Sequence, residues 1–213
     1  MKSKPTKTAR KPRFSMLRTF ALADLVTLGN AACGTGAIFL CLAYVAERDR
    51  SLLWAAFVLL PVALICDVLD GSIARWRHKH SPIGADLDSL ADVVSFGVAP
   101  AVLGFTLGMR GFWDALVLIY FVACGISRLA RYNVTAAQMS DASGKVKYYE
   151  GTPIPTSLLL VLVLGIAFGM RDVGEALWLG VLHLGPYEFH PLVLMYGLSG
   201  TLMASATLRI PKP

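Results

Sequence analysis

CDVLDGSIAR (residues 66–75) and GADLDSLAD (residues 84–92) are the two stretches that decide how this chain folds. Both place aspartates inside long apolar segments. An ionised carboxylate within a membrane-spanning helix costs at least about 2.5 kcal/mol, so such residues face the interior of a helix bundle and mark functional sites. The aspartates therefore predict two neighbouring helices with their acidic ends together.

The composition around these stretches is that of a membrane protein. Of the 213 residues, 55% are hydrophobic and 16% are charged. A soluble globular domain carries about 25% charged residues. The mean hydropathy of +0.59 points the same way. We therefore predict an all-α integral membrane protein.

Six apolar segments are long enough to be transmembrane helices, which need about 20 residues. They cover residues 22–46, 51–75, 84–109, 112–133, 153–171 and 190–208. A further apolar stretch at 174–189 is interrupted by glycine and proline. We expect it to form a re-entrant or interfacial piece on the outer side.

The basic residues predict the orientation. With six spans, sixteen of the 20 Lys and Arg residues fall on the side that holds both termini. The four on the other side are Arg48, Arg50, Arg110 and Arg171. Lys and Arg gather on the cytoplasmic side of membrane proteins. We expect cytoplasmic termini, and a site in the cell membrane that faces the cytoplasm.

The N-terminal residues form a separate basic segment. Seven Lys or Arg residues lie within the first 18 positions, and no acid precedes Asp24. We predict a cytoplasmic tail over residues 1–20 and a membrane domain over residues 21–210. The tail either binds anionic lipid or only fixes the topology. A nucleic-acid partner is not expected, because the chain offers no soluble domain to present the tail.

The spacing of the aspartates brings four carboxylates together. Asp67 and Asp70 are three residues apart, and Asp88 and Asp92 are four apart, so each pair shares one helix face. The short loop between the two segments makes the helices antiparallel neighbours. Asp86 lies off the shared face and is expected to be structural. Four converging carboxylates repel one another unless a cation lies among them.

The chemistry of this cluster predicts a metal site. Hard oxygen ligands favour Mg²⁺, Mn²⁺ or Ca²⁺ over zinc, and four carboxylates suffice for two ions. Gly71 and Ala74 remove side-chain bulk beside Asp67. Arg75 adds a positive charge suited to phosphate oxygens. Together these residues predict a diphosphate site at the cytoplasmic edge.

The full spacing is D-x-x-D-G-x-x-A-R, eight residues, then G-x-x-x-D-x-x-x-D. It is filled by Asp67, Asp70, Gly71, Ala74, Arg75, Gly84, Asp88 and Asp92. This pattern resembles the signature of the CDP-alcohol phosphatidyltransferase family, with every position matched. The resemblance implies six spanning helices, a site that faces the cytoplasm, and a homodimer.

Three stretches resemble the subgroup of this family that uses L-serine as acceptor. They are residues 84–100, 128–133 and 151–155, although Thr152 stands where an apolar residue is expected. The resemblance implies transfer of the phosphatidyl group from CDP-diacylglycerol to the serine hydroxyl. Phosphatidylserine and CMP would be the products of a direct displacement assisted by Mg²⁺ or Mn²⁺, with two ions expected.

The resemblance also assigns roles to residues. Asp67, Asp70 and Asp88 would be the main metal ligands, with Asp92 either a shared ligand or a neighbour of the ligands, and also the general base. The CDP site would consist of Asp70, Gly71, Ala74, Arg75, Gly84 and Asn30. Arg128 and Arg131 are three residues apart and, with Asn133, would hold the serine carboxylate or a lipid phosphate. Alternatively, the two arginines only anchor the end of their helix at the cytoplasmic surface of the membrane.

Other functions remain open at this point. The same chemistry with glycerol 3-phosphate, inositol phosphate or inositol as acceptor is the nearest alternative. The phosphorylated acceptors would require more cationic residues around the site. A cation transporter would place its acids near the middle of the membrane and need an outer opening. Arg75, beside the aspartates, would repel a transported cation.

Overall fold

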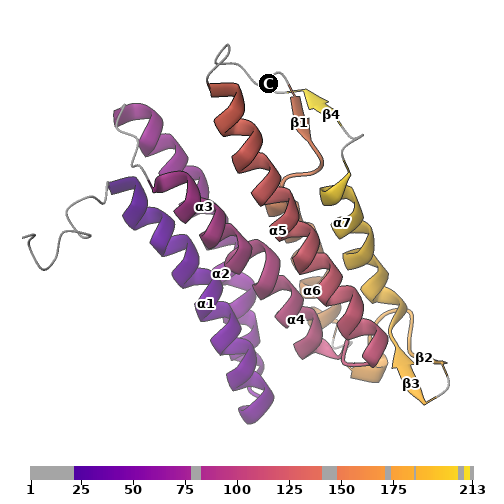
Figure 1. Ribbon diagram of the computed structural model, residues 1–213. Helices are drawn as coiled ribbons and strands as arrows, with labels where there is room; N and C mark the ends of the chain where they lie inside the picture. The colour runs from indigo at the N-terminus through magenta and orange to yellow at the C-terminus, as the bar shows by residue number, and fades with distance from the viewer. Residues whose placement is uncertain are drawn as a thin grey trace, which may run out of the picture.

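Seven α-helices form a bundle in the part of the chain that the computed structural model describes, residues 22–77, 83–140, 148–170, 174–184, 186–205 and 209–211 (Figure 1). They are α1 (Leu22–Glu47), α2 (Arg50–Arg77), α3 (Gly84–Asp92), α4 (Ala99–Leu107), α5 (Phe112–Ser140), α6 (Leu158–Gly169) and α7 (Leu194–Ala204). Helix α1 packs along α2 and also contacts α3 and α4, while α5 packs along α7. The predicted tail over residues 1–20 lies outside the described residues.

Four helical segments are long and apolar enough to cross a membrane. They are Leu22–Glu47, Arg50–Ile73, Gly84–Leu107 and Phe112–Thr135. The last two predicted spans appear as shorter apolar helices, Ile154–Gly169 and Pro191–Ala204. The membrane character of the chain is thus supported by four segments. The arrangement of six spans with cytoplasmic termini stays a prediction.

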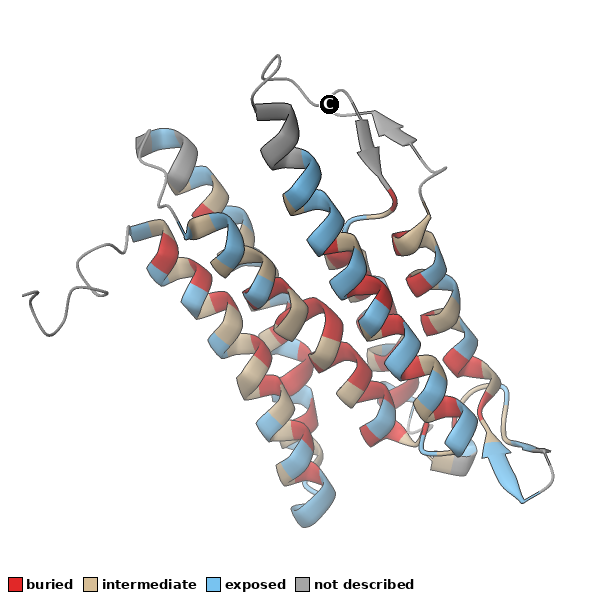
Figure 2. Cartoon of the chain, viewed as in Figure 1, coloured by how far each residue is buried: buried red, intermediate tan, exposed pale blue. Residues whose placement is uncertain are grey.

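The two sides of helix α1 differ in polarity. Its buried side begins with polar residues, Asp24, Thr27 and Asn30, and continues with small or apolar ones further along the helix. Large apolar side chains lie on its outer side, and Phe39 is 65% exposed. Figure 2 shows the buried residues on the inner faces of the helices. Polar groups inside and apolar groups outside are the pattern expected of a helix in a bilayer.

Helix α1 comes unusually close at Gly34 to the helical segment that contains Ser95. A Cβ atom at this position would lie 2.7 Å from the Cα atom of Ser95, so only glycine allows the approach. The Ser95 Oγ donates a hydrogen bond of 2.9 Å to the backbone oxygen of Asn30. This contact ties α1 to the helix that carries Asp88 and Asp92.

That helix changes its winding directly after Asp92. Residues Val93–Val98 form a π-helical segment that joins α3 to α4. Pro100 follows, and in a regular α-helix its ring would clash with the carbonyl four residues earlier. That carbonyl belongs to Phe96, inside the wider π-helical turn. The predicted single helix over 84–109 is confirmed as a continuous element over 84–107, but its π-helical winding was not anticipated.

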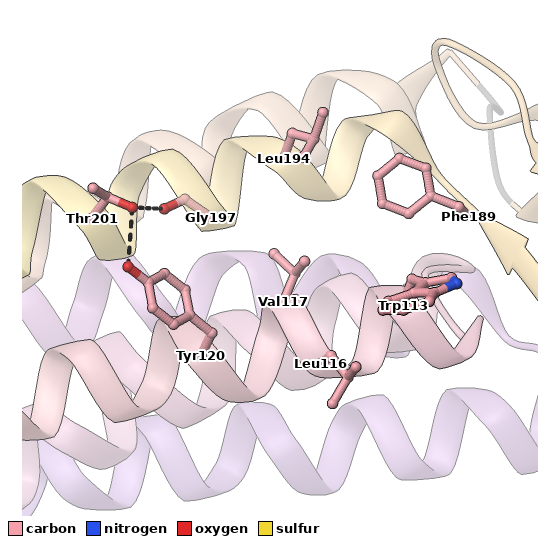
Figure 3. A pocket seen from close by; sticks show the side chains of 8 residues that line it. All are labelled: Trp113, Leu116, Val117, Tyr120, Phe189, Leu194, Gly197 and Thr201. Atoms are coloured by element: carbon pink, nitrogen blue, oxygen red, sulfur yellow. Dashed lines mark hydrogen bonds between the residues drawn. The ribbon is translucent and has the colours of Figure 1, made fainter. Parts of the chain in front are cut away.

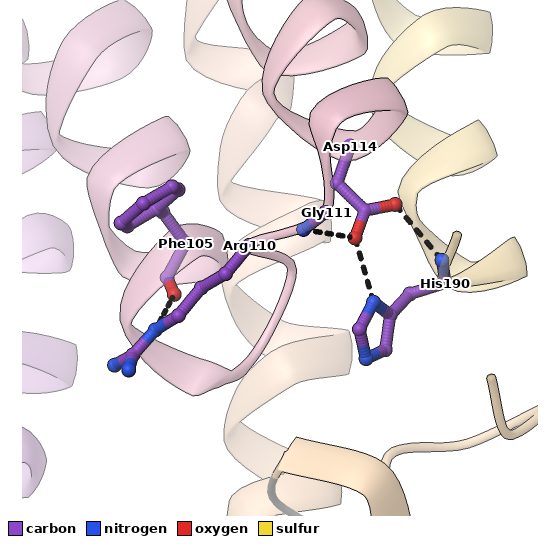
Figure 4. A network of polar contacts seen from close by, with 5 residues as sticks. All are labelled: Phe105, Arg110, Gly111, Asp114 and His190. Atoms are coloured by element: carbon purple, nitrogen blue, oxygen red, sulfur yellow. Dashed lines mark hydrogen bonds and ion pairs between the residues drawn. The ribbon is translucent and has the colours of Figure 1, made fainter. Parts of the chain in front are cut away.

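A buried hydrogen-bonded pair, Asp114 and His190, fixes the end of the bundle where α5 begins (Figure 4). The Asp114 side chain, at the start of α5, is 0% exposed and that of His190 3%. Asp114 accepts hydrogen bonds from the His190 backbone N–H at 2.8 Å and the Gly111 backbone N–H at 3.1 Å. Its Oδ2 also lies 2.6 Å from His190 Nδ1. The pair holds the chain before α7 against the first turn of α5.

Two short strand pairs modify the all-α prediction. β1 (Tyr148–Glu150) pairs antiparallel with β4 (Arg209–Pro211), and β2 (Leu182–Leu184) with β3 (Tyr187–Phe189). The stretch at 174–189 thus contains a 3₁₀ turn and a hairpin. Glycine and proline interrupt its apolar run, which explains why no helix forms over the hairpin.

An apolar groove of about 630 Å³ lies between α5 and α7 (Figure 3). It is lined by Trp113, Leu116, Val117, Tyr120, Phe189, Leu194, Gly197 and Thr201. The two hydroxyl groups in the groove bond each other, with Tyr120 Oη 3.1 Å from Thr201 Oγ1. No carboxylate or cation is among the described residues that line the groove, so the groove does not hold the charged chemistry predicted from the sequence.

Asp114→Ala should destabilise the fold by about 3 kcal/mol, because it leaves the buried His190 and the half-buried Gly111 N–H without their acceptor. Unfolding followed by tryptophan fluorescence in detergent measures this loss. Glu188→Ala is the matched control, since it removes an exposed carboxylate two residues from His190. Equal stability of the two variants would contradict the structural role of the buried pair.

Candidate active site

Three aspartates converge where α2 and α3 lie beside α1. Asp67 and Asp70 project from α2 one turn apart, and Asp88 projects from α3. One carboxylate oxygen from each lies within 4.8 Å of the other two. Asp70 is 6% exposed, while Asp67 and Asp88 are half-buried. The helical spacing predicts this convergence, and we refer to these three residues as the acidic cluster.

Asp92 lies next to the acidic cluster but outside the group of three converging oxygens. It is 7% exposed and lies one turn after Asp88 on α3. Asp88 and Asp92 are four residues apart on this helix, so their side chains share one face. Its Oδ1 accepts a hydrogen bond of 3.1 Å from Asn30 Nδ2. The four predicted carboxylates thus divide into three that converge and one that stands beside them.

Helix α1 adds polar residues that sequence analysis missed. Thr27 Oγ1 donates a hydrogen bond of 2.6 Å to Asp70 Oδ2. Asp24 is 2% exposed and lies one turn before Thr27 on the buried side of α1. Together with Asn30, these residues recur every three positions in an otherwise apolar helix. Polar residues at three-residue intervals in an apolar helix are the sequence pattern that could have identified Asp24 and Thr27.

The acidic cluster carries the features of a cation site. Asp67, Asp70 and Asp88 have no ion-pair partner among the described side chains. Asp88 Oδ1 is buried and has no hydrogen-bond partner in the described part of the protein. Carboxylates at this separation, away from water, repel one another strongly. The oxygen donor set fits Mg²⁺ or Mn²⁺, which would neutralise that repulsion.

The structure describes only some of the residues that were predicted to contact a diphosphate. Beyond its own helix, no described atom lies within 4 Å of the place where a Cβ of Gly71 would stand, so the described residues leave open space beside Asp70. Gly84 begins α3 and is half-buried. Ala74 and Arg75 belong to the last turns of α2, but their side chains lie outside the described residues. Their contact with a diphosphate stays a prediction.

The predicted acceptor residues on α5 reach different partners. Asn133 Nδ2 donates a hydrogen bond of 3.0 Å to Ser89 Oγ, directly beside Asp88. Arg131 instead donates a hydrogen bond of 2.9 Å to the backbone oxygen of Ala204, at the end of α7. Arg128 is half-buried and already engaged within the protein. Asp86 is exposed and away from the cluster, as its helical position predicts.

Comparison with known proteins gives a consistent result. The family model described as CDP-alcohol phosphatidyltransferase matches residues 20–187. The chain is 40% identical to the CDP-diacylglycerol–serine O-phosphatidyltransferase of Saccharomyces cerevisiae, over 97% of this chain and 76% of the yeast protein. It is 36% identical to the protein of the same name from Methanocaldococcus jannaschii, over 70% of this chain. It is 38% identical to the archaetidylserine synthase of Methanothermobacter thermautotrophicus, over 66% of this chain. The matches span 62% and 56% of these archaeal proteins.

Asp88→Asn should weaken Mn²⁺ binding by about tenfold or more, because it removes one of the three converging carboxylates. Free Mn²⁺ in a titration of the purified protein is measured by electron paramagnetic resonance. Asp86→Asn is the matched control, because it removes an exposed carboxylate from the same helix. If both variants lose the same affinity, the acidic cluster does not bind the metal.

Proposed function

The chain belongs to the CDP-alcohol phosphatidyltransferase family, and we propose that it transfers the phosphatidyl group from CDP-diacylglycerol to the hydroxyl of L-serine. Phosphatidylserine and CMP would be the products. The observation that carries the proposal is the convergence of Asp67, Asp70 and Asp88 between two apolar helices, with Asp92 beside them. The names of its relatives support serine as the acceptor.

In this reaction the serine hydroxyl attacks the β-phosphorus, which carries the diacylglycerol. A new bond forms between that phosphorus and the serine oxygen, and the bond to the CMP oxygen breaks. Asp92 would accept the hydroxyl proton as general base. The hydrogen bond from Asn30 engages Oδ1 of Asp92, which leaves Oδ2 for the proton.

Asp67, Asp70, Asp88 and the adjacent Asp92 would hold Mg²⁺ or Mn²⁺, with two ions in our proposal. Bound there, the metal supplies charge neutralisation on the diphosphate. The open space beside Gly71 supports a diphosphate position next to Asp70. We assign the remaining CDP contacts to Ala74, Arg75 and Gly84, while the Asn30 side chain, predicted to reach the nucleotide, bonds Asp92.

The acceptor site is assigned to Arg128, Arg131 and Asn133, which would hold the serine carboxylate or a lipid phosphate. The hydrogen bond between Asn133 and Ser89 supports this position, because it brings α5 to the helix of Asp88. The contact of Arg131 with the end of α7 favours an anchoring role for that residue.

The setting of the reaction is part of the same proposal. Six spans, cytoplasmic termini and a site that faces the cytoplasm would place residues 21–210 in the cell membrane, with residues 1–20 as the basic tail. We further propose a homodimer. The acidic cluster lies toward one end of the apolar segments Arg50–Ile73 and Gly84–Leu107, which supports a site at one membrane face over a transport path through the middle.

The purified protein, supplied with CDP-diacylglycerol and Mn²⁺ in detergent, should release CMP only when serine is added. Chelation by EDTA should abolish the release. Glycerol 3-phosphate, inositol phosphate and inositol are tested separately. Release with one of these acceptors would retain the displacement chemistry and replace serine. No release with any acceptor would refute the proposed function.

Asp92→Asn should abolish turnover and leave binding of the CDP-lipid largely intact, because the amide keeps the shape of the side chain but cannot take up the proton. CMP release and the affinity for a CDP-lipid analogue are measured on the same preparation. Activity above about a few per cent of wild type would rule out Asp92 as general base, since loss of such a group typically costs 10²–10⁴-fold.

A further inference from the structure

The buried face of α1 changes character along its length. Its first three buried residues, Asp24, Thr27 and Asn30, are polar, and the next is Gly34. Beyond Gly34 the buried residues are Ala37, Cys41 and Tyr44. The polar part of this face coincides with the aspartates of α2 and α3, because Thr27 and Asn30 each bond one of them.

Thr27 donates to only one carboxylate. Its hydroxyl carries a single proton, and Asp70 Oδ2 lies 2.6 Å away. The backbone oxygen of Ala23 lies at 3.1 Å in the preceding turn. A short hydrogen bond to a carboxylate is about twice as strong as one to a neutral oxygen, so Asp70 receives the proton. This bond fixes Oδ2 and leaves Oδ1 of Asp70 for a ligand.

Asn30 makes the corresponding contact with Asp92. Its Nδ2 donates to Asp92 Oδ1, and its backbone oxygen accepts from Ser95. Its side-chain oxygen is buried and has no partner among the described residues. Rotating the amide by half a turn would set that oxygen against the carboxylate, so the orientation with Nδ2 toward Asp92 is retained. An unpaired buried oxygen costs about 1–3 kcal/mol, which is a poor choice for stability alone.

We propose that α1 is the positioning element of the site, with Thr27 orienting Asp70 and Asn30 orienting Asp92. Each residue holds one oxygen of its carboxylate and directs the other toward the ligand. The role of Asn30 rests on the proposed function, because it acts through the general base. The role of Thr27 rests only on metal binding by the acidic cluster.

A positioning role for Asn30 differs from the contact with CDP that the sequence predicted for this residue. A residue that binds CDP would affect the affinity for the CDP-lipid, whereas a residue that orients the base affects turnover. Partners that orient metal ligands typically contribute 10–100-fold to metal affinity or activity. The two roles therefore separate in kcat and KM.

Thr27→Val tests the first contact, because valine keeps the shape of threonine and removes the hydroxyl. We expect Mn²⁺ affinity, measured by electron paramagnetic resonance, to fall about tenfold or more. Thr27→Ser, which restores the hydroxyl, should recover most of the affinity. Thr106→Val is the matched control, since Thr106 is a buried threonine of α4 outside the site. Wild-type Mn²⁺ affinity in Thr27→Val, or equal losses in the Val and Ser variants, would overturn the role of Thr27.

Asn30→Leu tests the second contact. We expect kcat to fall about 10–100-fold, with the KM for CDP-diacylglycerol within about threefold of wild type. The unfolding temperature should change little, because the loss of the donor to Asp92 is offset by the removal of the unpaired buried oxygen of Asn30. An increased KM for the CDP-lipid with unchanged kcat would overturn the positioning role and restore the nucleotide contact. A lower unfolding temperature with unchanged kcat would also overturn it, in favour of a structural role.

These results are separable from failure of the proposed function. If the wild-type protein released no CMP with any acceptor, the transferase proposal would fail, and with it the role of Asn30. The Mn²⁺ titrations of Thr27→Val, Thr27→Ser and Thr106→Val would still confirm or overturn the positioning of Asp70.

Discussion

Electrostatic repulsion among carboxylates in an apolar bundle is the constraint on which the rest of this structure depends. Asp67, Asp70 and Asp88 bring three oxygens within 4.8 Å of one another, in segments whose outer surfaces are suited to lipid. Such an arrangement is stable only if neutral donors hold the carboxylates and a cation neutralises them. The buried polar face of α1, the open space at Gly71 and the close approach at Gly34 all serve that requirement.

The polar groups that stabilise the fold and those of the candidate site lie at different ends of the bundle. At the end away from the acidic cluster, Asp114 and His190 satisfy each other, and Arg110 donates to the backbone oxygen of Phe105 (Figure 4). Both oxygens of Asp114 are thus occupied by partners within the protein. Near the acidic cluster, by contrast, Asp88 Oδ1 and Asn30 Oδ1 are buried and unpaired among the described residues. Unpaired buried groups persist where a function requires them, since stability alone would remove them.

The sequence predicted the acidic cluster because helical periodicity is local. Residues three or four apart share a face whatever surrounds them, and the short loop leaves two helices little choice but to pack as antiparallel neighbours. The role of Thr27 was not accessible in this way, because its partner Asp70 is 43 residues away and the contact depends on how closely α1 approaches. The π-helical turn at Val93–Val98 and the bond from Arg131 to Ala204 were missed for the same reason. Each is decided by tertiary packing, for which residue type is only weak evidence.

The choice of neutral partners for the carboxylates follows from the chemistry they have to support. An arginine or lysine at position 27 or 30 would satisfy the charge of Asp70 or Asp92 and compete with any bound cation for the same oxygens. A hydroxyl and an amide instead occupy one oxygen each and add no charge. The carboxylates are thereby fixed in direction but remain anionic toward the ligand. A site that must bind metal and accept a proton within a few ångströms needs both properties, and threonine and asparagine are small enough to supply them from the buried face of a helix next to glycine.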